Sequence, residues 1–237
     1  EEWGPSSTRN GGVNMKSVIL LSGGLDSAVC LYEEMQVASC YTLCMDYHQT
    51  RQCETLAASE LAVLAGVEEH CELDVTFPFK ESPLLNPSFD HDQRMEIEGR
   101  IQREVSPVYF PARNTVFLSL ALSWAESLGA EKVIFGATAD DRLFPDCLPP
   151  YVAAMNAVSA AGTATRPQVV APLNTLQKEE VVAIGDELNV PFEETVSCYR
   201  GMRTDTGWLH CGICDACRGR RNAFYTADVL DPTEYGV

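Results

Sequence analysis

Short apolar runs alternate with longer amphipathic segments along most of the chain, and this alternation constrains the fold more than any other feature. The apolar runs predict strands at 17–21, 40–46, 71–76, 132–136 and 168–171. The intervening segments predict helices at 27–36, 52–65, 114–128, 150–161 and 176–188. Strands and helices in alternation are typical of an α/β fold of the Rossmann type, a parallel sheet with helices on both faces. Ligands of such sheets bind beyond the carboxyl ends of the strands.

The length of 237 residues suits one large domain with a small appendage. We expect an α/β domain over residues 15–190 and a small C-terminal region over residues 191–237. Residues 1–14 precede a Met-Lys pair that resembles a natural start, so we expect a disordered or expression-derived segment there. A native flexible extension is the alternative. Residues 80–105 are polar and contain prolines, which predicts an irregular excursion, either a lid over the site or a solvated loop.

The charge balance restricts the classes of partner. A net charge of −17 argues against general nucleic-acid binding, because phosphate recognition needs a basic face. Neither a membrane-spanning stretch nor a secretory signal is evident, so we expect a cytoplasmic protein without membrane contact. Several arginines in one late segment predict either a local anion-binding surface or only a compositional bias. They are Arg200, Arg203, Arg218, Arg220 and Arg221.

The first predicted strand ends in the stretch Ser22-Gly-Gly-Leu-Asp-Ser27, where a helix is expected to begin. Glycines there let the backbone approach a ligand closely, and the N–H groups of a helix N-terminus favour an anion. The stretch therefore predicts a phosphate cradle, with a tight capped turn as the structural alternative. Asp26 would repel a bare phosphate, so it indicates a bound Mg²⁺ or a helix cap. Neither GxxxxGK[ST] nor GxGxxG occurs at this strand.

The late cysteines have the spacing of a metal site. Cys211, Cys214 and Cys217 are close enough in sequence to converge from one turn, and Cys198 can complete a tetrahedron. Four thiolates predict a structural Zn²⁺, with an iron–sulfur cluster as the alternative. Other cysteines lie in apolar periodic segments and are expected to be small core residues. These are Cys30, Cys40, Cys44, Cys53 and Cys71.

The glycine-rich stretch matches the pyrophosphate loop of the N-type ATP pyrophosphatases. With the cysteines included, the chain resembles the QueC family of 7-cyano-7-deazaguanine synthases from about Lys16 to Phe224. Further shared motifs are Tyr47-x-Gln49, Phe110-Pro-Ala-Arg-Asn114, Pro145-Asp-Cys147, Pro172-Leu173 with Lys178-Glu179, and Thr195-x-Ser-Cys-Tyr199. The resemblance implies an adenine nucleotide alpha hydrolase-like fold with a small zinc-binding C-terminal subdomain.

The resemblance also implies an ATP-dependent ligase of queuosine biosynthesis that forms C–N bonds. Its substrate would be 7-carboxy-7-deazaguanine, which is adenylated and then reacts with ammonia to give an amide. A second ATP would activate the amide for dehydration to the nitrile, with release of AMP or ADP and phosphate species. A homodimer is expected.

Individual residues take roles from the same resemblance. The ATP-binding residues would be Leu21, Ser22, Gly23, Gly24, Leu25, Asp26 and Ser27. The catalytic residues would be Asp26, Ser27, Arg113 and Lys178. The substrate-binding residues would be Tyr47, Gln49, Phe110, Arg113 and Asp146. We expect Asp146 to accept the N–H donors of the deazaguanine edge, with a helix cap as the alternative.

Two segments depart from the usual family motifs. The family usually has Tyr-x-Gln-Arg-His where this chain has Thr50-Arg51 after Gln49. It usually has Ser-Gly-Tyr-Pro-Asp-Cys-Arg where this chain has Arg-Leu-Phe-Pro-Asp-Cys-Leu from Arg142 to Leu148. The departures keep a second hypothesis open, a QueC-like ligase that joins the activated acid to another amine, such as a protein N-terminus. Family relatives in bacterial defence clusters suggest it. A non-enzymatic nucleotide sensor is the third hypothesis.

Overall fold

The computed structural model describes residues 15–49, 53–80, 82, 84–86, 105–106 and 108–236. The expectation for residues 1–14, most of the expected excursion at 80–105, and Thr50 and Arg51 lie outside these residues.

The main sheet is parallel throughout, and its strand order is β3-β2-β1-β4-β5. The strands are β1 (Lys16–Leu20), β2 (Ser39–Asp46), β3 (Glu69–Asp74), β4 (Lys132–Ile134) and β5 (Gln168–Val170). Each strand begins within two residues of the start predicted for it. β1 is central because both of its faces are apolar: successive residues Val18 and Ile19 belong to different halves of the core and are fully buried.

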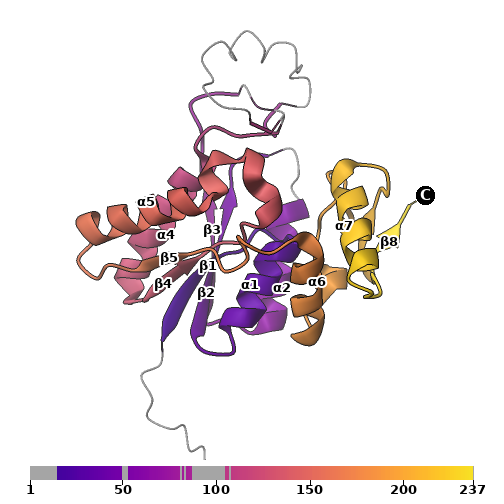
Figure 1. Ribbon diagram of the computed structural model, residues 1–237, viewed down its shortest axis with the longest axis horizontal. Helices are drawn as coiled ribbons and strands as arrows, with labels where there is room; N and C mark the ends of the chain where they lie inside the picture. The colour runs from indigo at the N-terminus through magenta and orange to yellow at the C-terminus, as the bar shows by residue number, and fades with distance from the viewer. Residues whose placement is uncertain are drawn as a thin grey trace, which may run out of the picture.

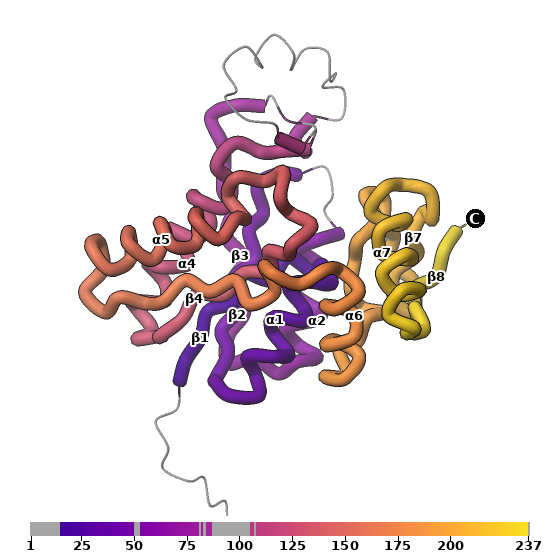
Figure 2. Tube along the Cα trace, in the orientation of Figure 1, coloured from indigo at the N-terminus to yellow at the C-terminus, as the bar shows by residue number. Residues whose placement is uncertain are grey.

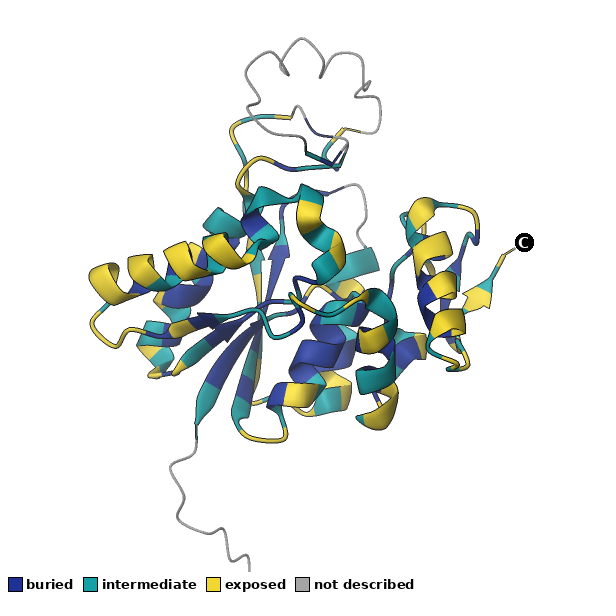
Figure 3. Cartoon of the chain, in the orientation of Figure 1, coloured by how far each residue is buried: buried dark blue, intermediate teal, exposed yellow. Residues whose placement is uncertain are grey.

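Helices cover both faces of this sheet (Figure 1). They are α1 (Leu25–Glu34), α2 (Cys53–Ala65), α4 (Arg113–Leu128), α5 (Pro149–Gly162) and α6 (Lys178–Glu187). α1, α2 and α6 pack on one face and α4 and α5 on the other, as the two core clusters show. The predicted α/β architecture is confirmed. Figure 3 shows the buried residues filling the strands and the exposed ones lying on the outer sides of the helices.

The C-terminal part adds a second, small sheet beside α6 (Figure 2). It contains β6 (Met202–Thr204), β7 (Gly207–His210) and β8 (Glu234–Tyr235), with α7 (Asp215–Thr226) between the last two. The sequence analysis did not predict these strands, which have only two to four residues each. Phe224 of α7 joins the main core, where its ring lies 4.9 Å from that of Phe192. Within the described ranges, no helix has the length and apolar character needed to cross a membrane.

Candidate active site and four-cysteine centre

A cavity of about 330 Å³ opens beyond the carboxyl ends of β1, β2 and β4. The strand order reverses between β1 and β4, and ligands of open α/β sheets bind at such switch points. Residues at the ends of all three strands line the cavity, including Leu21, Met45 and Ala137. The cavity therefore lies at the edge of the sheet where the sequence predicts a ligand site.

The glycine-rich loop between β1 and α1 forms one wall of the cavity. Gly23 has a φ of 78°, and a Cβ there would lie 2.6 Å from the backbone oxygen of Glu54, so only glycine fits. The hydroxyl of Ser27 donates to the carbonyl of Gly24 at 2.9 Å and accepts from the amide of Ser22 at 3.2 Å. Gly24 precedes α1 without a side-chain cap, so the first N–H groups of the helix are available to an anion.

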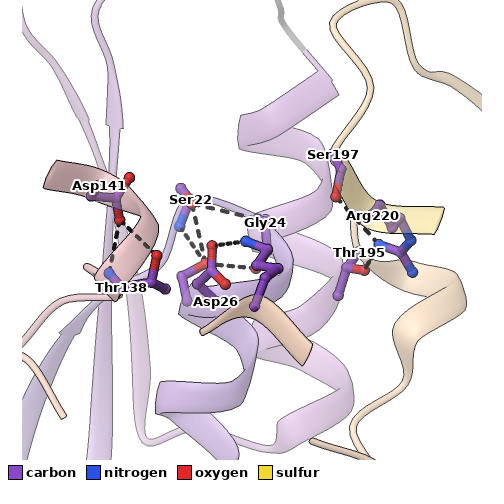
Figure 4. A network of polar contacts seen from close by, with 10 residues as sticks. Ser22, Gly24, Asp26, Thr138, Asp141, Thr195, Ser197 and Arg220 are labelled. Atoms are coloured by element: carbon purple, nitrogen blue, oxygen red, sulfur yellow. Dashed lines mark hydrogen bonds and ion pairs between the residues drawn. The ribbon is translucent and has the colours of Figure 1, made fainter. Parts of the chain in front are cut away.

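Asp26 and Lys178 form an ion pair at this wall (Figure 4 shows Asp26 with its loop neighbours). Lys178 is the first residue of α6, far from the loop in sequence, and its ammonium binds Oδ2 of Asp26. The second oxygen of Asp26, Oδ1, is buried and has no hydrogen-bond partner within the described part of the chain. A carboxylate oxygen of this kind suits Mg²⁺, which prefers oxygen ligands.

The wall contributed by α4 and β2 carries the predicted substrate-binding residues Tyr47, Gln49 and Arg113. Arg113, the first residue of α4, donates from Nη1 to the Tyr47 hydroxyl at 3.2 Å. The Gln49 side-chain oxygen accepts from the Tyr47 amide at 3.0 Å, which fixes both residues in the same turn after β2. A cation and an aromatic ring thus share this wall.

Two predicted substrate-binding residues are not among the cavity walls. Phe110 is buried in an aromatic cluster, with its ring 4.6 Å from Phe77 and 5.6 Å from Tyr47. Asp146 accepts from the backbone amide of Asn114 at 2.9 Å and is 7% exposed. It therefore caps the N-terminus of α4, which is the alternative that the sequence analysis left open.

Sequence reasoning missed several residues that line the cavity, among them Glu54, Asn114, Val196 and Tyr199. Asp141 is the most informative of the missed residues. Its Oδ2 accepts from the amide and hydroxyl of Thr138, at 2.8 Å and 3.1 Å, in a capping box. Burial, together with the charge of Asp26, raises the pKa of Asp141. Its place just after β4, at the carboxyl edge of the sheet, was a signal that could have identified it.

Two cysteine thiols also face the cavity, Cys44 and Cys147. Burial raises the pKa of Cys44 to about 12 and raises that of Cys147 as well, so both stay protonated near neutral pH. Since the thiolate is the nucleophilic form, neither group is suited to covalent catalysis. The cavity therefore offers positioning and electrostatic stabilisation to its ligand.

The four predicted metal ligands converge on one point beside α7. The sulfur atoms of Cys198, Cys211, Cys214 and Cys217 all lie within 4.8 Å of one another. Thiolates around a tetrahedral zinc ion, at about 2.3 Å from the metal, are separated by roughly 3.8 Å. The observed Cys211–Cys217 separation of 3.9 Å fits that geometry, and a space of this size suits a single ion better than a multi-iron cluster.

Backbone amides donate to the sulfurs of Cys198 and Cys211. The amides of Arg200 and Cys211 both donate to the Cys198 sulfur at 3.2 Å. Donation from the backbone amides of Ile213 and Cys214 lowers the pKa of Cys211 to about 6. Metals bind the thiolate form, so hydrogen bonds that stabilise it favour a metal here.

Two of the five late arginines are engaged in contacts within the protein. Arg220 is 1% exposed, and Arg203 makes ion pairs of 3.0 Å with both Glu60 and Glu194. These two arginines stabilise the C-terminal part of the fold. Arg200, Arg218 and Arg221 are exposed, so a local anion-binding surface there stays a prediction.

The fold and the site define an α/β protein of the nucleotide-binding type with a cluster of four cysteines. The chain belongs to the family described as queuosine biosynthesis protein QueC, whose model matches residues 16–228. It is 38% identical over 229 residues to a 7-cyano-7-deazaguanine synthase from a Nostoc species, an alignment covering 93% of this chain and 97% of the relative. A 7-cyano-7-deazaguanine synthase from Thermosynechococcus vestitus is 40% identical over 230 residues, 94% of this chain and 96% of its own length.

A solved structure from Methanocaldococcus jannaschii, described as a predicted subunit of tRNA methyltransferase, is also similar. It covers 93% of this chain and 92% of its own, with a TM-score of 0.48 and 13% sequence identity.

Proposed function

We propose that this protein uses ATP and ammonia to convert 7-carboxy-7-deazaguanine to 7-cyano-7-deazaguanine. The names of its family relatives support this substrate, since the alignments cover nearly the whole chain. One observation about the site carries the proposal. A single cavity has an uncapped helix N-terminus with a glycine loop on one wall, and Arg113 with Tyr47 on another. Such a cavity suits a phosphate chain and a planar acid in contact.

The first chemical step is adenylation of the substrate carboxylate. A carboxylate oxygen attacks the α-phosphorus of ATP, and the bond to the bridging oxygen breaks to release pyrophosphate. The loop from Ser22 to Ser27 is suited to hold the leaving pyrophosphate through its backbone N–H groups. Lys178 is ion-paired with Asp26 of this loop, and we propose that its charge helps to neutralise the charge that develops on the leaving group.

Asp26 is the residue that would hold Mg²⁺, because its Oδ1 is buried without a protein partner at the loop. A bound Mg²⁺ supplies positive charge to the phosphate oxygens. Lys178 keeps the other carboxylate oxygen in place through its ion pair.

The second half of the cavity is suited to the deazaguanine ring. Tyr47 and Phe117 provide aromatic surface there, and Arg113 lies close enough to the Tyr47 ring to attract a carboxylate to the same wall. Ammonia attacks the adenylated carbonyl, AMP leaves, and a proton is lost to give the amide. A second ATP then adenylates the amide oxygen with release of pyrophosphate. Loss of AMP and a proton from that species gives the nitrile.

A product assay tests this proposal. The purified protein is incubated with ATP, Mg²⁺, ammonium and the acid, and AMP, pyrophosphate, amide and nitrile are measured by mass spectrometry. We expect two AMP and two pyrophosphate for each nitrile, and no nitrile when ammonium is omitted. Absence of pyrophosphate release both with and without the acid would contradict the proposal and favour the non-enzymatic nucleotide sensor.

A second candidate function is ligation of the activated acid to another amine, such as a protein N-terminus. The observation that favours it is local: Phe144 and Cys147 line the cavity, and they belong to the segment from Arg142 to Leu148 that departs from the family motif. The same assay separates the two functions. A product that stops at the amide with ammonia, or a mass increase on an added protein, supports the ligase.

We further propose that the four-cysteine centre holds a structural Zn²⁺, which its sulfur spacing supports. The expected homodimer, the protein partner and the division of the chain near residue 190 stay predictions.

A further inference from the structure

A five-residue segment, Thr195 to Tyr199, connects the cavity to the four-cysteine centre. Its side chains serve different sites in turn. Val196 and Tyr199 line the cavity, and Cys198 between them is one of the four clustered sulfurs. A shift of this segment would therefore move a wall of the cavity and a metal ligand together.

The segment is also bonded to the glycine loop. The amide of Val196 donates to the carbonyl of Gly23 at 2.9 Å. The Val196 side chain packs in a small buried cluster with Ala57 of α2 and Trp208 of β7. The loop conformation at Gly23 thus depends on where this segment lies.

Arg220 of α7 fixes the segment from the other side (Figure 4). Its Nη1 donates to the hydroxyls of Thr195 at 2.6 Å and Ser197 at 3.4 Å, and its Nη2 donates to the Phe192 carbonyl at 2.8 Å. Its Nε donates to Asp231 at 3.2 Å, and the charge of Arg220 helps lower the pKa of that carboxyl. Burial of a guanidinium is costly unless its donors are satisfied, so this one is committed to a single geometry.

Arg220 also lies close to the metal ligands along the chain. It follows Cys217 by three residues in the same helix, and residues at that spacing share a helix face. Both are buried. α7 carries Cys217 to the sulfur cluster and Arg220 to the segment Thr195 to Tyr199. The helix therefore forms a rigid link between the cluster and the segment.

We infer that Arg220, acting through Thr195, is a positioning residue that couples the four-cysteine centre to the ATP-binding geometry of the glycine loop. The inference rests on the proposed function only in that the loop binds ATP. Arg220 itself is not among the described residues that line the cavity. Its effect is to hold the segment, and through Val196 the carbonyl of Gly23, in the position that shapes the loop.

The experiment uses the full chain and a non-hydrolysable ATP analogue with a methylene group in place of the α,β-bridging oxygen. Thr195→Val removes the hydroxyl with little change of shape, whereas Thr195→Ser keeps the hydroxyl. Arg220→Lys keeps the positive charge but lacks the planar guanidinium with its several N–H donors. Arg221→Gln is the matched control, because Arg221 is exposed on the same helix. Metal per chain, melting temperature and the Kd of the analogue are measured for each protein.

We expect Thr195→Val and Arg220→Lys to weaken analogue binding roughly tenfold with full metal content, a change of about 1.4 kcal/mol. Thr195→Ser and Arg221→Gln should stay within about twofold of the unaltered chain. If Thr195→Val only lowers the melting temperature and leaves Kd unchanged, the inference is wrong, whether or not Arg220→Lys folds. An unaltered chain that binds the analogue but forms no nitrile would contradict the proposed function and leave this inference standing.

Discussion

The two walls of the cavity are built in different ways. The glycine-loop wall comes from one continuous stretch, Ser22 to Ser27, held by bonds among its own residues and by Gly23, whose conformation excludes a side chain. The opposite wall is assembled from side chains on separate elements, with Tyr47 following β2, Arg113 beginning α4 and Phe144 between two short 3₁₀ helices.

This difference bears on which half of the chemistry can vary. Changes in a continuous backbone loop disturb its phosphate geometry directly, whereas a wall of separate side chains can be altered one residue at a time. The departing segment from Arg142 to Leu148 contributes Phe144 and Cys147 to the cavity, and the loop stretch keeps the family pattern. The ATP half of the proposed reaction is therefore expected to be the constant half.

The strongest test of the loop wall is Asp26→Ala. Loss of the carboxylate, with its buried Oδ1, removes the proposed Mg²⁺ ligand and leaves Lys178 without its partner. We expect turnover to fall by about a hundredfold or more, the size expected when one electrostatic group is removed from a site. Steady-state pyrophosphate release measures it. Asp186→Asn, on the exposed side of α6, is the control and should behave as the unaltered chain does. Near-normal release by Asp26→Ala would remove the proposed role.

Cys214→Ser tests the four-cysteine centre, which the segment Thr195 to Tyr199 connects to the loop wall. A missing thiolate weakens the metal site, and metal binding contributes folding free energy. We expect the melting temperature to fall by roughly 10 °C, given about 2–4 °C for each kcal/mol in a chain of this size. Elemental analysis should show zinc in the unaltered protein and less in the variant. Cys71→Ser, outside the cluster, is the control. Iron in place of zinc, or an unchanged melting temperature, would contradict the assignment.

Gly23→Ala tests whether the backbone conformation of the glycine loop tolerates a side chain at its closest contact with α2. The added Cβ meets backbone and Ala57 atoms within 3 Å and the backbone has a positive φ, so both strain and collision oppose it. Gly66→Ala is the matched control, because Gly66 has a φ of 66° and no atom of the described residues lies within 4 Å of an added Cβ. We expect a loss of about 1 kcal/mol for Gly66→Ala and roughly 2–3 kcal/mol for Gly23→Ala in urea unfolding. Equal losses would show that the close contact at Gly23 relaxes freely.

The sequence predicted the sheet, its helices and the cluster of cysteines because each leaves a local trace. Strand and helix periods are visible in a few residues, and Cys211 to Cys217 are close in the chain. The bonding of Lys178 to Asp26 and of Arg220 to Thr195 joins distant segments, and a single sequence carries no signal of such pairing. The short strands β6 to β8 were not predicted for a related reason, since two to four residues are too few to show the alternation of a strand.

The smallest expected effect concerns Asp146, beside the second wall, for which the sequence offered two roles. If Asp146 accepts N–H donors of the deazaguanine edge, Asp146→Asn replaces an acceptor with a donor and should raise the KM for the acid well above tenfold. If it caps α4, as its bond to the Asn114 amide indicates, asparagine caps nearly as well and KM should stay within about twofold. We expect the second result, because Asp146 is buried and is not among the residues that line the cavity. Asp146→Ala, which cannot cap, should cost about 1 kcal/mol in urea unfolding and shift Arg113, which begins the same helix. A large KM effect of Asp146→Asn at unchanged stability would instead return Asp146 to the substrate and extend the second wall beyond the cavity described above.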